Sequence, residues 1–265
     1  MPLLALVAVF LAFFLFVRYL EKTALFYPSQ DMHASPADAG LAFEDVWFRA
    51  EDGVKLHGWF IPGDNARRNM LYFHGNAGNI SDRVEKMAFF RSLGFNVFVF
   101  DYRGYGLSEG RPDETGIFRD GRAAFDHIAS RADVGRLPTV LYGASVGGAV
   151  SIDVASLRRP AALITEATFT NAKDVARIYY PFVPGFMISL KFESDRKITA
   201  ISCPKLMLHS RTDEIIPYRL GRRLFEKAAE PKEFLEVRGG HNDNVFQSMD
   251  MVREAMARFL GKYGL

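Results

Sequence analysis

The stretch GASVG, from Gly143 to Gly147, contains a serine whose surroundings suit nucleophilic catalysis. It follows the apolar run Val140–Tyr142 and precedes a segment with helical character. A serine nucleophile needs a sharp turn between a strand and a helix, with small residues on both sides and its hydroxyl exposed. A helix beginning at Val146 would direct its first backbone N–H groups toward the site. This context favours Ser145 as a nucleophile over a serine in an ordinary glycine-rich loop.

A serine hydroxyl needs a general base, and the chain has six histidines. His241 follows the last predicted strand in the stretch RGGHNDN, on a loop that can bend over the edge of a sheet. His209 is an alternative, because it ends an earlier predicted strand. His57 and His127 lie inside predicted elements, which is typical of structural histidines. The chain order of serine, acid and histidine favours His241 as the base.

The base in turn needs a carboxylate that orients its imidazole. Asp213 comes just after the predicted strand Lys205–His209, in the stretch HSRTDEIIP, and before a helix opened by Pro217. Aspartates at such places often only shape a turn. Glu214, its neighbour, and Glu166, which follows an earlier strand, are competing acids. The position at a strand end favours Asp213.

Backbone donors for a developing oxyanion are predicted at two places in the chain. The stretch FHGNAGN follows the third predicted strand, and its glycines let the backbone approach a substrate oxygen. The predicted donors are the N–H groups of Asn76, or alternatively of Ala77, and of Val146. The side-chain amide of Asn76 is a further alternative.

Strands and helices alternate from Phe43 onward, which would bring these residues to one sheet edge. The run Phe95–Phe100 is continuously apolar, as in a parallel strand buried on both faces. The turn Glu51–Gly53 predicts an opening hairpin and thus an antiparallel edge. The repeated units predict the α/β class, with a mostly parallel central sheet of about eight strands and helices on both faces. The predicted strands cover 44–49, 55–61, 70–73, 95–100, 139–142, 161–165, 205–209 and 233–237.

The segment 169–201 interrupts this alternation and predicts a small cap. Its stretch IYYPFVPGFMISLKF is apolar but contains prolines, which would prevent one long helix beside the sheet edge. We expect Phe182, Phe186 and Met187 in this cap to bind the acyl part of a substrate. Packing of these side chains on the core is the alternative.

The first 17 residues carry no charged side chain. As a helix they would span about 26 Å, just short of the apolar core of a bilayer at about 30 Å. No basic residue precedes the run, which argues against a cleaved signal peptide; an interfacial helix is the other alternative. The sequence predicts a single-pass membrane anchor over 1–27 and a globular domain over 28–265. Arg18 and Lys22 follow the run and favour a cytoplasmic domain.

The composition excludes several classes of protein. The 265 residues include 33 basic and 31 acidic side chains, so no charge surplus favours a nucleic-acid partner. Cys203 is the only cysteine, which excludes an intrachain disulfide and a cysteine metal cage. No HExxH-type metal motif occurs. We expect neither a metal nor an organic cofactor.

The motifs FHGNAGN, DYRGYGLSEG, GASVG, RTDEIIP and GGHNDN occur in this order. With them, the chain resembles the α/β-hydrolase-fold serine hydrolases from about Phe43 to its C-terminus. The stretch FYPS after an apolar N-terminus is similar to the membrane-anchored subgroup that includes protein-depalmitoylating thioesterases and bacterial relatives. The resemblance implies Ser145, Asp213 and His241 as a catalytic triad, and a structural role for Asp101–Gly106.

The predicted function is hydrolysis of carboxylic esters or thioesters through an acyl-enzyme on Ser145. An apolar cap beside the nucleophile, on a domain with an apolar N-terminus, favours a small-molecule or lipid-like acyl substrate and membrane association. A serine peptidase or an acyltransferase could use the same triad. A non-enzymatic binding module on this fold is the alternative from another class. The sequence leaves the acyl length and the oligomeric state open.

Overall fold

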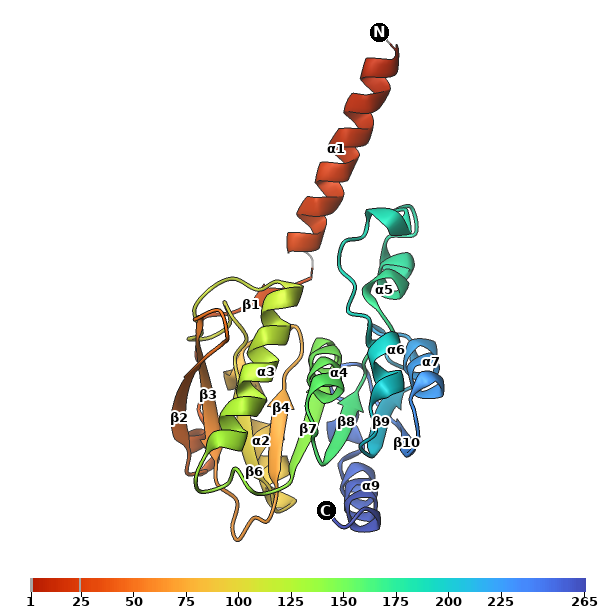
Figure 1. Cartoon of the computed structure of the whole chain (residues 1–265). Coiled ribbons are helices and arrows are strands. Elements are labelled where there is room, and N and C mark those ends of the chain that lie inside the picture. Colours follow the sequence, from red (N-terminus) through yellow and green to blue (C-terminus); the bar gives the residue numbers. More distant parts are fainter. Residues whose placement is uncertain (1, 24) are drawn as a thin grey trace.

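A twisted sheet covered by helices on both faces forms the main part of the molecule (Figure 1). The computed structural model describes residues 2–23 and 25–265. Within these residues the main sheet has eight strands, in the order β10-β9-β8-β7-β4-β6-β3-β2. The α/β class and the sheet of about eight strands predicted from the sequence are confirmed.

The elements are as follows. The strands are β1 (Tyr27–Pro28), β2 (Glu44–Arg49), β3 (Lys55–Ile61), β4 (Asn69–Phe73), β5 (Ala77–Gly78), β6 (Asn96–Phe100), β7 (Thr139–Ala144), β8 (Ala162–Glu166), β9 (Lys205–Ser210) and β10 (Lys232–Val237). The α-helices are α1 (Pro2–Thr23), α2 (Val84–Ser92), α3 (Glu114–Ser130), α4 (Val146–Leu157), α5 (Ala172–Tyr179), α6 (Ser194–Lys197), α7 (Tyr218–Lys227), α8 (Asn244–Gln247) and α9 (Met249–Lys262). Short 3₁₀ helices are η1 (Pro36–Ala39), η2 (Ile80–Arg83), η3 (Gly185–Met187) and η4 (Ile198–Ala200).

The strands of the main sheet are parallel except at one edge. β2 pairs with β3 and β3 pairs with β6 in antiparallel orientation, which confirms the predicted hairpin and antiparallel edge. The remaining neighbours are parallel, so the ends of β4, β7, β8 and β9 lie along one edge. β1 and β5 form a separate parallel pair, with Tyr27 opposite Ala77. This pair ties the chain that follows α1 to the loop after β4.

Two apolar cores lie on the two faces of the sheet. Successive side chains of β4 divide between them, with Leu71 and Phe73 in one core and Met70 and Tyr72 in the other. The first core includes side chains of α3, α4 and α7, and the second includes side chains of α2 and α9. Because both faces are buried, the central strands are continuous apolar runs. We refer to these two sides as the α3/α4 face and the α2/α9 face.

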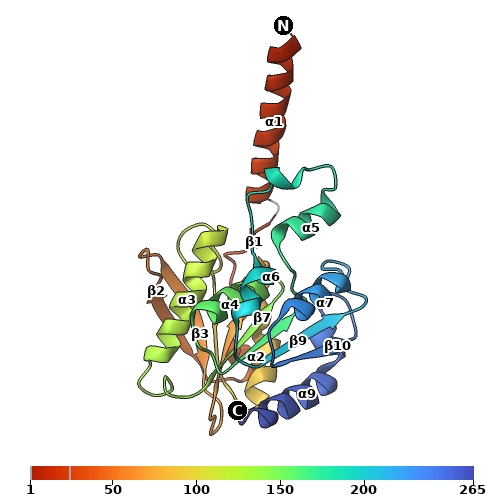
Figure 2. The ribbon, with the colours of Figure 1, turned by 45° about the vertical axis from the view of Figure 1, so that its right-hand side comes forward.

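The chain between β8 and β9 contains α5, η3, α6 and η4, in the segment predicted as a cap. α5 and η3 stand away from the sheet toward α1, whereas α6 lies beside α4 and α7 (Figure 2). Phe192 lies between η3 and α6, and its buried ring contacts the ring of Phe169 and that of Phe118 on α3. We call residues 167–192 the cap segment.

The last turns of α1 are bound to the cap segment. The guanidinium of Arg18 donates a hydrogen bond to the carbonyl oxygen of Met187. The carboxylate of Glu21 accepts hydrogen bonds from the N–H groups of Ser189 and Leu190, at 2.7 and 3.1 Å. The earlier turns of α1 project from the body of the molecule (Figure 1).

The predicted membrane-spanning anchor over 1–27 is not supported by the structure. Among the described residues, no helix has both the length and the apolar character needed to cross a membrane. The apolar run ends at Arg18 and Glu21, whose charged groups bind the protein itself. Met1 and Ala24, which belong to the predicted anchor, lie outside the described residues.

Candidate active site

Ser145 lies at the turn between β7 and α4, as predicted. Its φ of 53° and ψ of −118° are strained for a residue with a side chain. The turn is also tight, because a Cβ atom on Gly143 would overlap the backbone of Gly147, and one on Gly147 would overlap the backbone of Phe73. The two glycines of GASVG are therefore required by close backbone approach around the serine.

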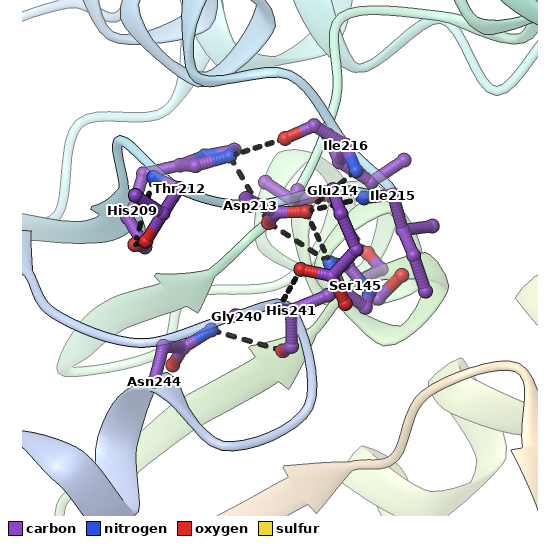
Figure 3. A network of polar contacts seen from close by, with 12 residues as sticks. Ser145, His209, Thr212, Asp213, Glu214, Ile215, Ile216, Gly240, His241 and Asn244 are labelled. Carbon is purple, nitrogen blue, oxygen red and sulfur yellow. Dashed lines mark hydrogen bonds and ion pairs between the residues drawn. The ribbon is translucent and has the colours of Figure 1, made fainter.

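His241 and Asp213 form a buried pair on the loops that follow β10 and β9 (Figure 3). Nδ1 of His241 lies 3.0 and 2.9 Å from Oδ1 and Oδ2 of Asp213. An imidazole held through Nδ1 in this way presents Nε2 for proton transfer. His241 and Ser145 line the same cavity, so the structure brings together the three residues that the sequence singled out.

The carboxylate of Asp213 is held in the charged form by several donors. Burial would raise its pKa, but hydrogen bonds from His209 and His241 outweigh burial and hold the pKa of Asp213 well below its usual value. The backbone N–H groups of Ile215 and Ile216 also donate to Oδ1, at 2.9 and 2.7 Å. A carboxylate that stays charged near neutral pH suits stabilisation of an imidazolium.

The residues that the sequence offered as alternative bases and acids hold other groups of the site in place. Nε2 of His209 lies 2.8 Å from the carbonyl oxygen of Ile216 and 3.3 Å from Oδ2 of Asp213, so it helps to hold the acid (Figure 3). Glu214 accepts a hydrogen bond from the backbone N–H of His241 at 3.0 Å and fixes that loop. Glu166 instead pairs with Lys86 at 2.7 Å.

The predicted oxyanion donors lie next to the serine. Asn76, Ala77 and Val146 all line the cavity that contains Ser145. Val146 is the first residue of α4, and the first N–H groups of a helix have no partner within the helix. Stabilisation of an oxyanion by these backbone groups stays a prediction.

The loop after β4 is held by tyrosines from the stretch DYRGYGLSEG. The hydroxyl of Tyr105 donates to the carbonyl oxygen of Asn76 at 2.7 Å, and that of Tyr102 donates to the carbonyl oxygen of His74 at 3.0 Å. Asp101 is fully buried and accepts a hydrogen bond from the N–H of Ile80 at 3.0 Å. The stretch Asp101–Gly106 thus has the structural role that the resemblance implied.

A cavity of about 800 Å³ opens around Ser145 and His241. One side is apolar and is formed by the cap segment, the end of α1 and the chain after it, including Val17, Leu25, Phe169, Val175 and Val183. The other side is polar and includes Tyr72, Asp82, Arg83, Lys86 and Glu166. We call these the apolar lobe and the polar lobe. In the described part of the chain, no cluster of three or more His, Cys, Asp or Glu could hold a metal ion.

The structure does not bring the three predicted acyl-binding residues to the cavity. Phe182 and Phe186 are 64% and 78% exposed at the tip of the cap segment. Met187 is buried between Val17 and Val183 and does not line the cavity. The cap segment does line the cavity that contains Ser145, but with other side chains than the sequence predicted.

Comparisons with known proteins agree with this fold. A family model described as serine aminopeptidase S33 matches residues 64–191. An uncharacterized protein of Mycobacterium tuberculosis is 34% identical over 98% of this chain and 94% of that protein. The alpha/beta hydrolase domain-containing protein WAV2 of Arabidopsis thaliana is 34% identical over 89% of this chain and 84% of that protein. The chain belongs to the α/β-hydrolase family.

Two further similarities concern proteins with named activities. The lysophosphatidylserine lipase ABHD12 of Macaca fascicularis is 33% identical over 82% of this chain and 62% of that protein. The solved structure of an esterase from Pyrococcus furiosus has a TM-score of 0.75 and 18% identity, covering 90% of this chain and 98% of that one. At this identity, the solved structure shows that the fold is shared.

Proposed function

We propose that this protein hydrolyses carboxylic esters or thioesters of acyl chains through an acyl-enzyme on Ser145. The observation that carries the proposal is the buried pair of His241 and Asp213, of which His241 lines the same cavity as the strained serine. A relative named as a lipase and a structural neighbour named as an esterase support ester bonds as the target.

The proposed reaction uses groups that the site already contains. The Oγ atom of Ser145 attacks the acyl carbonyl carbon while Nε2 of His241 takes its proton, and Asp213 stabilises the imidazolium. Backbone N–H groups of Val146 and of Asn76 or Ala77 stabilise the oxyanion. His241 then protonates the leaving oxygen or sulfur. A water molecule, deprotonated by the same imidazole, attacks the acyl-enzyme; the bond to Oγ of Ser145 then breaks, and the imidazolium returns the proton to this oxygen as the carboxylic acid leaves.

The apolar lobe is the proposed site of the acyl chain. With one leaving group and acyl chains from acetyl to octanoyl, kcat/KM is expected to rise with length, by up to about fourfold per methylene, because each buried methylene contributes up to about 0.8 kcal/mol. Ala176 lines this lobe from α5, so Ala176→Phe should shorten the preferred chain. Lys173→Phe adds the same side chain at an exposed position on α5 and serves as control. A flat chain-length profile, or equal profiles for the two variants, would contradict this assignment.

Peptide hydrolysis is the second candidate, because the matching family model is described as a serine aminopeptidase. A peptidase would use the same nucleophile and base but would have to protonate a leaving amine. Aminoacyl p-nitroanilides assayed beside p-nitrophenyl esters of equal length separate the two. Faster turnover of the anilides would replace the ester proposal.

We also propose that the N-terminal helix attaches the protein to a lipid surface without crossing it. Leu3, Leu6, Phe10 and Phe14 of α1 belong to a set of exposed apolar side chains on this helix. The exposed Phe182 belongs to the cap segment, which is bound to the end of α1. Exposed apolar surface of this extent is typical of a contact with lipid or protein. Attachment here would hold the apolar lobe close to lipid-like substrates.

Flotation with phosphatidylcholine vesicles tests this attachment. The wild-type chain is expected to float with the vesicles, and a double variant Leu6→Glu and Phe10→Glu to lose binding by about tenfold or more, because charged groups are costly in the apolar region of a bilayer. Leu157→Glu changes a similarly exposed leucine at the end of α4 and should float like the wild type. Equal flotation of all three proteins would reject α1 as the lipid-binding element.

A further inference from the structure

The polar lobe of the cavity contains an ion pair that the proposed reaction does not use. Nζ of Lys86 lies 2.7 Å from Oε2 of Glu166, and the two residues are only 7% and 2% exposed. The hydroxyl of Tyr142 donates a hydrogen bond to the same carboxylate oxygen. Lys86 and Glu166 line the cavity together with Ser145.

This pair is attached directly to the turn that carries the nucleophile. The backbone N–H of Ser145 donates to the carbonyl oxygen of Glu166 at 2.8 Å, and Glu166 is the register partner of Ala144. Lys86 comes from α2, on the α2/α9 face. The apolar lobe is lined by Phe169 and other side chains of the core on the α3/α4 face. Ser145 therefore lies between an apolar lobe and a polar lobe on opposite sides of the sheet edge.

The pair has hydrogen-bonding capacity left over. An ammonium group carries three N–H bonds, and in the part of the chain that the structure describes Glu166 is the hydrogen-bond acceptor of Lys86. The Lys86 ammonium otherwise faces the rings of Tyr142 and Phe246, at 5.8 and 5.7 Å from their centroids. Oε1 of Glu166 has no donor among the same residues.

A buried ion pair of this kind is not explained by stability alone. Desolvation of two charges offsets most of their attraction, and apolar side chains of similar volume are often as stabilising. The remaining N–H groups of Lys86 and Oε1 of Glu166 are instead a donor and an acceptor available to a bound molecule at the cavity wall.

We propose that Lys86 and Glu166 form the subsite for the leaving group, and that this subsite takes an uncharged alcohol bearing additional hydroxyl groups. A hydroxyl accepts a hydrogen bond from Lys86 and donates one to Glu166, so it satisfies both partners at once. The pair has no net charge, and Asp82 and Arg83, which also line the polar lobe, add one charge of each sign. A charged leaving group attracted by one member would be repelled by the other. The inference rests on the proposed ester hydrolysis at Ser145.

Two esters with the same acyl chain test the subsite in the wild-type protein. 1-Monooctanoylglycerol and propyl octanoate differ only in the hydroxyl groups of a three-carbon leaving alcohol. With each value divided by the rate of alkaline hydrolysis of that ester, kcat/KM is expected to be about tenfold or more higher for the glycerol ester, because hydrogen bonds to charged groups are strong. Both esters are used below their micellar range.

A double variant removes both charges without leaving either one unpaired. Lys86→Met combined with Glu166→Leu is expected to bring the normalised ratio of the two esters close to one. Lys262→Met with Glu233→Leu removes an exposed pair of the same 2.7 Å separation and should keep the wild-type ratio. Thermal unfolding checks that each variant is folded. If the double variant does not fold, Glu166→Gln keeps the side-chain shape, removes the charge and is expected to lower the ratio in the same direction.

The outcomes separate this inference from the proposed function. Equal normalised turnover of both esters by the wild type, or a wild-type ratio in a folded Lys86 and Glu166 variant, overturns the leaving-group subsite while ester hydrolysis stands. Absence of turnover of both esters, or turnover that persists in Ser145→Ala, overturns the proposed function itself.

Discussion

Replacement of Ser145 by alanine is expected to lower kcat/KM for p-nitrophenyl octanoate by about 10⁴ or more and to abolish labelling by a fluorophosphonate probe. The loss is large because no acyl-enzyme can form without the Oγ atom, and only binding and the oxyanion donors remain. The strained backbone at this position is supported by the surrounding turn, so the alanine variant should still fold.

Ser156→Ala is a matched control for the serine prediction. Ser156 belongs to the same helix, α4, and its hydroxyl donates to the carbonyl oxygen of Asp153 at 2.7 Å, away from the cavity. This variant should be labelled and should turn over substrate like the wild type. Labelling of Ser145→Ala with its activity intact would show that another residue is the nucleophile.

Replacement of His241 by alanine is expected to cause a loss of similar size, about 10⁴ in kcat/KM, because the serine then lacks its base. His209→Gln is the informative comparison. Its imidazole donates toward Ile216 and Asp213, so its removal should loosen the acid and cause a much smaller loss. Steady-state kinetics of the two variants with one ester decide which of the two histidines is the general base.

The opposite order would contradict the assignment of the base. If the His209 variant is inactive and the His241 variant is active, His209 on β9 receives the serine proton, and His241 after β10 does not. Asp213→Asn adds a check, since it should lower activity strongly whichever histidine is the base, whereas Glu214→Gln should act only through the loop of His241.

The candidate site could be predicted because its signals are local. Ser145, Asp213 and His241 each follow a strand, and parallel strands bring their ends to one edge. Gly143 and Gly147 are required by contacts within a few residues or with the adjacent strand. The motif therefore indicated a tight turn at Ser145 from the sequence alone. The central strands could also be predicted from local sequence, because burial on both faces gives a continuous apolar run without polar alternation.

The ion pair of Lys86 and Glu166 could not be predicted, because it joins residues that are far apart in the chain. One signal was present in the sequence. Lys86 is next to Met87 and four residues before Phe90, so it lies on the apolar side of a short helix. A lysine in such a position must either extend to solvent or find a buried partner. Which partner it finds depends on how α2 packs on the sheet.

The contacts of the cap segment and of the N-terminal helix could not be predicted, for a different physical reason. Pro181 and Pro184 remove the helical period that would indicate which aromatic side chains face inward, and Phe182 and Phe186 prove to be exposed. The long apolar run at the N-terminus likewise indicates that the helix is hydrophobic, but it does not indicate which residues its C-terminal turns contact. The binding of Glu21 to Ser189 and Leu190 has no signature in the sequence.

The participation of the α1 end in the cavity wall has a consequence for how the enzyme should be prepared. Val17, Glu21, Leu25 and Tyr27 contribute to the wall, although they precede the strands of the main sheet. Deleting an apolar N-terminus is a usual way to raise protein yield, and here it would open the apolar lobe to solvent. The shortened protein would keep the proposed nucleophile and base and should still cleave small esters. Its selectivity for acyl-chain length, however, would differ from that of the intact protein, so substrate profiling requires the intact N-terminus.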